Sequence, residues 1–87
     1  MATGELIGKV IHAYDKINVA VLRLNQDLKI GDSVHFHGHS TDFQQEIASM
    51  QVEYQAVTEA KAGTEVAVKV KERVRSGDSV YRPAPSG

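Results

Sequence analysis

The residues best suited to metal chemistry are three closely spaced histidines, His35, His37 and His39. On a strand His35 and His37 share one face, and imidazoles at this spacing could hold Zn²⁺, Ni²⁺ or Cu²⁺ if His12 or Asp42 came near. In the alternative, they lie on a solvent-facing strand edge with the intervening apolar residues turned inward. A metal site also needs groups behind its ligands that orient the imidazoles, and nothing in the sequence identifies such groups. We therefore predict no tight transition-metal site.

Four basic residues at alternate positions near the end of the chain could bind a phosphate backbone. They are Lys69, Lys71, Arg73 and Arg75. If an extended strand runs through them, they share its outer face at intervals of about 6.6 Å, twice the rise per residue of a strand. Tyr81 or Tyr54 could then serve as a stacking platform for bases. The alternative is an edge strand that its charges keep soluble.

Two aspartates, Asp32 and Asp78, could form a carboxylate pair for acid and base catalysis. Each follows a glycine in an expected turn, however, where an aspartate bonds to its own backbone. Ser33 and Ser79 lack the sharp strand-to-helix turn that exposes a serine nucleophile. We therefore predict turn roles for the aspartates and no catalytic residues.

The sequence excludes several other kinds of chemistry. It has no cysteine, which excludes a disulfide framework, a thiolate zinc site and a cysteine nucleophile. It lacks the Gly-x-x-x-x-Gly-Lys-Ser/Thr loop that cradles phosphates, so the chain is not a GTPase by itself. We expect a protein that is not an enzyme, uses no cofactor and binds no nucleotide by itself.

Size and charge point to one small domain. A chain of 87 residues buries roughly 60 to 65% of its unfolded surface, and we expect a single domain over residues 1–82 followed by a flexible tail over residues 83–87. The net charge of −1 argues against nucleic-acid binding through bulk charge alone. The charge is uneven, because residues 41–65 carry five acids against one lysine, whereas residues 66–87 carry five bases against two acids.

The start of the chain lacks the basic region and apolar run of a signal peptide. No apolar stretch approaches the ~20 residues that span a bilayer. We expect a soluble, cytoplasmic protein without membrane contact.

Apolar alternation predicts strands over most of the chain. The tetrapeptide Gly-Asp-Ser-Val occurs at residues 31–34 and again at 77–80, and each copy is expected to turn into a strand. Residues 6–12 form a first strand in which Gly8 marks a bulge or a close backbone approach. Residues 64–70 alternate inward valines with outward residues. The apolar run from Val19 to Leu24 either has both faces covered or offers one face to a partner.

Residues 43–62 allow two interpretations. Phe43, Ile47, Met50 and Tyr54 fall at helical spacings, and Gly63 lies where a helix would end. Against a helix, apolar residues alternate with polar ones from Met50 to Gln55, and a long helix would leave too few strands for a barrel. Periodicity alone does not decide between the two.

The whole pattern resembles the second, β-barrel domain of translational GTPases such as elongation factor Tu, and most closely the short stand-alone proteins described as translation elongation factor-like. A related barrel also occurs as a C-terminal extension of some collagenase-like peptidases. The residues that carry the resemblance are Leu28 to Asp32 with Val34, Phe36 and Gly38; Ser49 to Gln51; Ala60 to Gly63 with Val66 and Val68; and Gly77, Asp78 and Val80.

The resemblance implies an all-β fold, a closed six-stranded Greek-key barrel in which Phe43 to Tyr54 is extended. Two departures weaken a transfer of function: Asp15 to Asn18 replaces a glycine-rich turn, and Leu22 replaces a glycine. For this reason we do not transfer the pocket that receives the aminoacyl end of transfer RNA.

The function expected from the resemblance is that of a non-catalytic β-barrel binding module. It would contact RNA, a ribonucleoprotein or a translation or RNA-modification protein, with the four basic residues as the nucleic-acid contacts. The alternative is a protein-interaction module with no RNA role that uses the apolar outer face of Val19 to Leu24.

Overall fold

A computed structural model describes residues 4–83, and in this range the chain is all-β apart from one short 3₁₀ turn. The elements are β1 (Glu5–Tyr14), η1 (Asp15–Ile17), β2 (Val19–Leu24), β3 (Leu28–Lys29), β4 (Ser33–His37), β5 (Asp42–Glu46), β6 (Met50–Val52), β7 (Gln55–Val57), β8 (Glu59–Ala60), β9 (Glu65–Lys69) and β10 (Ser79–Arg82). The predicted all-β class is confirmed. The predicted flexible tail falls mostly on residues 84–87, which lie outside the described residues.

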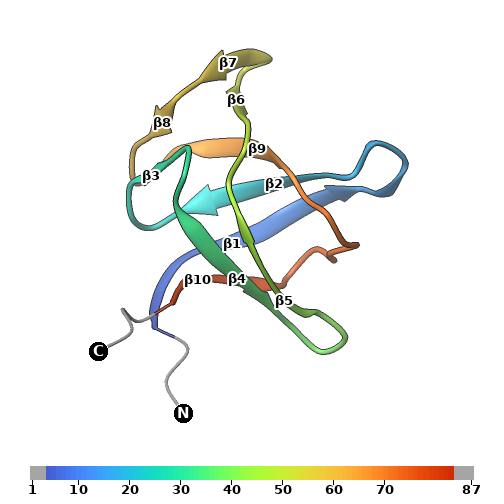
Figure 1. The fold of residues 1–87 in the computed structure, drawn as a ribbon. Helices are drawn as coiled ribbons and strands as arrows, with labels where there is room; N and C mark the ends of the chain where they lie inside the picture. Colours follow the sequence, from blue (N-terminus) through green and yellow to red (C-terminus); the bar gives the residue numbers. More distant parts are fainter. Residues whose placement is uncertain (1–3, 84–87) are drawn as a thin grey trace.

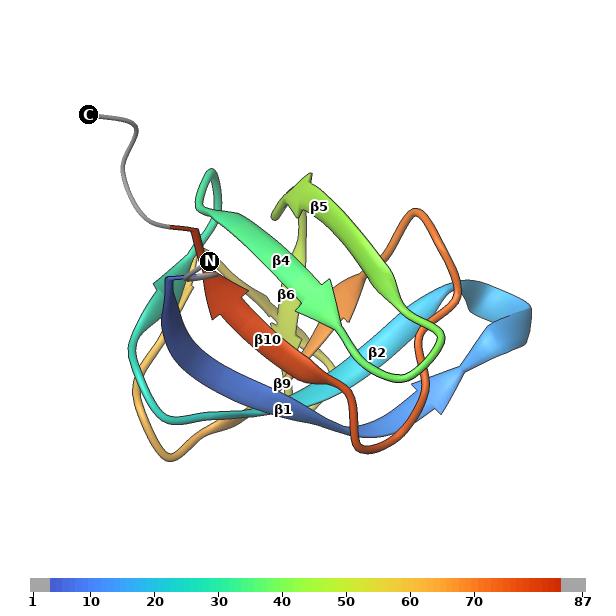
Figure 2. The same cartoon turned by 90° about the horizontal axis from the view of Figure 1, so that it is seen from below.

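Eight of the strands form one antiparallel sheet in the order β5-β4-β10-β1-β2-β9-β6-β7. The short strands β3 and β8 pair separately with each other. The sheet curls around its buried face, as the two views in Figures 1 and 2 show. The prediction of a closed six-stranded barrel is wrong, because β5 and β7 end the strand order and the curled sheet makes a half-barrel.

A side chain bridges part of the gap that the backbone leaves open. The Gln45 amide nitrogen donates to the Lys69 carbonyl oxygen at 2.8 Å, and the Lys71 backbone N–H donates to the Gln45 amide oxygen at 2.9 Å. The glutamine amide thereby links β5 to the end of β9 with the donor and acceptor pair that a neighbouring strand would offer.

The core lies on the inner face of the curled sheet, where alternate residues of each strand point. Phe36 on β4 and Phe43 on β5 stack with ring centroids 5.0 Å apart. The predicted inward positions of Val34, Val66 and Val68 are confirmed, since all three are buried. The remaining core residues are Ile7, Val10, Ala20, Leu22, Leu24, Leu28, Ile47, Met50, Ala60, Val70, Val74 and Val80.

The two Gly-Asp pairs form the same turn twice. Gly31 and Gly77 have φ of 96° and 98°, a conformation that side chains disfavour. The Asp32 carboxylate accepts a hydrogen bond at 3.1 Å, and that of Asp78 one at 2.9 Å, each from the backbone N–H three residues earlier. The predicted turn role of both aspartates is confirmed by this geometry.

Gly8 lies at a β-bulge and at a close backbone approach, the two features that the sequence suggested as alternatives. The register between β1 and β10 shifts between Leu6 and Gly8, which is a bulge. A Cβ atom at Gly8 would lie 2.7 Å from the carbonyl oxygen of Arg23 on the neighbouring strand. The backbones of β1 and β2 therefore approach more closely here than a side chain would allow.

The ambiguous segment is extended, as the resemblance implied, and its helical spacing has a local cause. Phe43 on β5 and Met50 on β6 both point into the core, and Ile47 is buried in the bend between the two strands. The backbone N–H of Ile47 donates to the Asp32 carbonyl oxygen, while its own carbonyl accepts from Gly31. The bend inserted between two strands reproduces spacings of four and three residues without a helix.

Within residues 4–83, no helix has the length and apolar character needed to cross a membrane.

Candidate functional site

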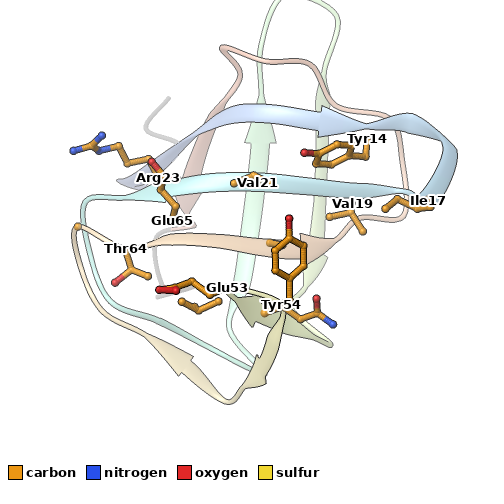
Figure 3. A pocket seen from close by; sticks show the side chains of 13 residues that line it. Tyr14, Ile17, Val19, Val21, Arg23, Glu53, Tyr54, Thr64 and Glu65 are labelled. Carbon is orange, nitrogen blue, oxygen red and sulfur yellow. The ribbon is translucent and has the colours of Figure 1, made fainter.

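A groove of about 780 Å³ opens where the β6–β7 hairpin leaves the sheet. β6 pairs with β9 only at Met50 with Val68 and at Gln51 with Ala67. Beyond Gln51 the hairpin has no partner on β9, and its tip stands away from the outer face of the sheet. The groove lies between this tip and the strands β2 and β9 (Figure 3).

The floor of the groove is apolar and comes from three strands. Residues directly opposite each other on paired strands share a face, and the register pairs Tyr14 with Val19 and Val21 with Ala67. The two valines are half-buried, whereas Tyr14 is 47% exposed. Ile17, in the loop between β1 and β2, extends the floor and is 58% exposed.

The apolar run of β2 is thus divided between two faces. Ala20, Leu22 and Leu24 are buried in the core, whereas Val19 and Val21 belong to the groove. Only alternate residues of the predicted apolar outer face from Val19 to Leu24 therefore lie outside, since side chains alternate along a strand.

The wall opposite this floor is a strained turn that carries an aromatic ring. Glu53 and Tyr54 join β6 to β7 and have φ of 51° and 66°. Two successive positive φ values define the type I′ hairpin turn, which favours Asn-Gly. A side chain in this conformation costs roughly 1–2 kcal/mol. Tyr54 is nevertheless 97% exposed, and its ring projects toward β2 in Figure 3.

One end of the groove is charged. Arg23 on β2 lies opposite Glu65 on β9, and Glu53 adds a second carboxylate from the hairpin turn. Figure 3 shows these residues at the end away from Tyr14 and Ile17. The groove therefore combines an aromatic and aliphatic floor with a charged end that has one more acid than base.

The predicted basic residues do not share one strand. β9 ends at Lys69, and the backbone N–H of Lys71 already bonds to a glutamine side chain. Arg73 lies beside Asp15, with 3.7 Å between its Nε and a carboxylate oxygen, and the Arg75 backbone enters the second Gly-Asp turn. All four side chains are exposed. The extended geometry that the phosphate-tracking prediction requires is absent from this segment.

The His35 and His37 rings lie on one face of β4 with centroids 6.1 Å apart, and each also contacts a neighbour of its own. His35 Nε2 lies 2.5 Å from a carboxylate oxygen of Asp42, while the His37 ring meets the Tyr81 ring edge-on at 6.4 Å between centroids. His12 packs against Tyr14 on the outer face instead, with ring centroids 4.4 Å apart. Among residues 4–83, no three histidine, aspartate or glutamate side chains gather in a group that could hold a metal ion.

A carboxylate outside the groove, that of Asp27, stabilises the loop between β8 and β9. The Ala62 backbone N–H donates to Asp27 at 2.9 Å, and Lys61 lies 3.6 Å from the same carboxylate. The hydrogen bond first, and the lysine charge after it, hold the pKa of Asp27 below its ordinary value. Hydrogen bonding to Glu59 and the charge of Glu59 raise the pKa of Lys61.

Sequence reasoning missed the groove, although it mentioned two of its parts. The sequence suggests Tyr54 as a stacking platform for bases and the outer face of β2 as an apolar surface for a partner, but it does not indicate that the two lie opposite each other. The available signal was the apolar alternation through Met50, Val52 and Tyr54, which ends in a residue that the fold leaves exposed. The turn itself gave no signal, because neither Glu nor Tyr is typical of a type I′ turn.

No protein-family model matches this sequence. The chain is 43% identical over 76 residues to an uncharacterized protease of Methanocaldococcus jannaschii, and 32% identical over 78 residues to a collagenase of Porphyromonas gingivalis. These matches cover 86% and 87% of this chain but 19% and 22% of the relatives. The chain thus spans about a fifth of the length of the curated relatives it matches.

A solved structure has the same fold. The crystal structure of the C-terminal domain of a U32 peptidase of Geobacillus thermoleovorans matches with a TM-score of 0.86, and the match covers 97% of this chain and 98% of that domain. The sequence identity is 22%, so the likeness concerns the fold.

These similarities correct the interpretation drawn from translation factors. The relatives are named as proteases and collagenases, and the matching structure is a peptidase domain. The prediction of an elongation factor-like module that contacts RNA or a translation or RNA-modification protein is therefore wrong. The motifs that suggested translation factors are strand and turn signals, which indicate a small β-domain and do not distinguish one function from another.

Proposed function

We propose that this chain acts as an accessory domain of a peptidase, in which it holds polypeptide for a separate catalytic part and cleaves no bond itself. The observation that carries the proposal is the share of each protein that the alignments span. The alignments span most of this chain but only about a fifth of each protease or collagenase relative. A peptidase C-terminal domain also has this fold over 98% of its length.

The residues of the chain support a non-catalytic role. The sequence has no cysteine nucleophile. Ser33 and Ser79 each follow a Gly-Asp turn, and the aspartates of these turns use their carboxylates to bond backbone N–H groups. Such carboxylates hold the backbone of a turn, which supports a structural role for them over acid and base catalysis.

The groove supports the holding role. Exposed apolar residues that gather on one face mark a binding surface more often than scattered ones do. Tyr14, Ile17 and Tyr54 gather in this way around the half-buried valines of β2. We also propose that the chain works in a reducing compartment such as the cytoplasm, which its lack of cysteine supports.

Binding and cleavage of an unstructured polypeptide test the proposal. We would titrate the purified chain into fluorescently labelled gelatin, follow the anisotropy, and examine the same samples by gel electrophoresis after long incubation. Labelled dextran controls for non-specific binding. We expect saturable binding of gelatin without cleavage. Failure to bind gelatin would overturn the proposal. So would a gelatin-cleaving activity that co-purifies with the chain and is lost when the chain is removed from the sample.

A further inference from the structure

We propose that the groove binds a polypeptide segment in the polyproline II conformation, with proline rings packed against Tyr14 and Tyr54. This inference rests on the proposed polypeptide-holding function and names the class of segment that is held.

The aromatic residues are placed for ring packing. Tyr14 comes from the end of β1 and Tyr54 from the β6–β7 turn, so the two tyrosines line the groove from separate elements across the valines of β2 (Figure 3). Grooves lined by aromatic rings are the usual receptors of proline-rich segments. The carbonyl groups of a polyproline II segment have no internal hydrogen bonds, and tyrosine hydroxyls can donate to them.

The pairing of the sheet favours side-chain recognition over strand addition. A peptide that adds as a β-strand needs an open sheet edge. β2, which forms the middle of the groove floor, is paired with β1 on one side and with β9 on the other. Its backbone hydrogen bonds are therefore already made, and it offers the groove a face of side chains. A polyproline II segment, which needs no ladder of backbone hydrogen bonds, suits such a face.

The strained Glu53–Tyr54 turn supports a binding role independently of the residues that line the groove. Glu53 and Tyr54 hold a left-handed conformation that Asn-Gly would adopt at lower cost. The exposed tyrosine gains little from packing in the free chain, so the strain is not offset there. Backbone strain of this kind concentrates at binding sites, where it fixes a side chain in advance. Because the turn fixes the backbone of Tyr54, only the side-chain rotamers remain to be ordered when a ligand packs on the ring.

The charged end adds a preference. At that end of the groove, the two carboxylates of Glu53 and Glu65 and the single guanidinium of Arg23 give a net charge of −1. A bound segment with a lysine or arginine at this end would be complementary in charge, and its affinity would fall as salt screens the pair.

Two peptides of equal length and charge test the inference by isothermal titration calorimetry. One is a run of prolines that ends in lysine, and the other is a flexible Gly/Ser peptide that ends in lysine. We expect the proline peptide to bind at least about tenfold more tightly, since the flexible peptide gives up more conformational entropy and lacks rings to pack.

Variants at the turn then locate the site. Tyr54→Ala and Tyr54→Gly both remove the ring, but the glycine also relieves the positive φ. We expect both to weaken binding of the proline peptide at least about tenfold, and Tyr54→Phe to stay within about threefold of the wild type. Ile30→Ala removes an apolar side chain that is 42% exposed outside the groove and should leave binding unchanged. Far-ultraviolet circular dichroism confirms that each variant is folded.

Equal affinity for the two peptides would overturn the inference, as would wild-type affinity in Tyr54→Gly. Either result together with saturable gelatin binding would remove only the inference, whereas failure to bind gelatin removes the proposed function itself.

Discussion

The two Gly-Asp turns and the Glu53–Tyr54 turn solve similar geometric problems with opposite kinds of residue. The former place glycine where φ is positive and use the next aspartate to bond the backbone. The latter places two side chains in left-handed conformations, one of them an exposed aromatic ring. The difference indicates that the Gly-Asp turns favour the stability of the fold, whereas the Glu53–Tyr54 turn accepts strain at the position where we propose that a ligand packs on the ring.

The largest expected effect comes from a side chain placed in a Gly-Asp turn. Gly77→Val should lower the free energy of unfolding by about 2 kcal/mol or more, because a β-branched residue at φ of 98° is strongly disfavoured. Chemical denaturation measures the change. Ser40→Val, at an exposed loop residue whose φ is not positive, is the matched control and should change little. An equal loss in both variants would show that the turn conformation is not the cause.

The aspartates of the two turns should differ in importance. Asp78 is 6% exposed and its hydrogen bond from the Arg75 N–H is partly buried, so Asp78→Ala leaves that N–H without its acceptor and should cost about 1–3 kcal/mol. Asp32→Ala exposes its N–H donor to water and should cost about half as much. Denaturation of both variants, with Asp78→Asn as the conservative control, checks the order. A larger loss at Asp32 would contradict it.

Relief of strain at the Glu53–Tyr54 turn should raise the stability of the fold while it weakens ligand binding. Tyr54→Gly should raise the free energy of unfolding by about 0.5–1 kcal/mol, since glycine adopts a positive φ without the cost paid by tyrosine. Gln55→Gly, one residue further on in β7, should instead lower it by about 0.5–1 kcal/mol. If Tyr54→Gly is no more stable than the wild type, the contrast between the turns loses its energetic basis.

The smallest effect concerns a turn whose carboxylate comes from elsewhere in the chain. Gly63 has φ of 87°, and the neighbouring Ala62 N–H is bonded by Asp27. Because the folded pKa of Asp27 is depressed, its contribution is fully present above its ordinary pKa of 3.8 and disappears as pH falls through the lower folded value. Thermal midpoints of wild type and Asp27→Asn should therefore differ slightly at neutral pH and converge in acid. A difference that persists in strong acid would assign the effect to packing.

The parts of the fold that depend on local residue choice could be predicted from the sequence. Glycine followed by aspartate identifies a turn, and the alternation of Val66 and Val68 with polar residues identifies β9. Gly8 gave both its bulge and its close approach. In each case the physical cause lies within a few residues of the signal.

The groove and the form of the sheet depend on contacts between distant residues. The hairpin leaves β9 after Gln51 because pairing stops there, and no local pattern encodes that point. The half-barrel is bridged by one glutamine side chain at Gln45, which looks like any other polar residue of a strand. The Glu53–Tyr54 turn violates local preference, so a reading based on preference could not find it.

The position of β10 in the sheet order sets when the protein can fold during synthesis. Among the described residues 4–83, β10 comes last in the sequence, yet it lies between β1 and β4 and joins the β4–β5 hairpin to β1. Until residues 79–82 emerge from the ribosome, Phe36 and Ile7 lack the strand that brings their two parts of the core together. The sheet of this domain therefore remains incompletely assembled until β10 has been made.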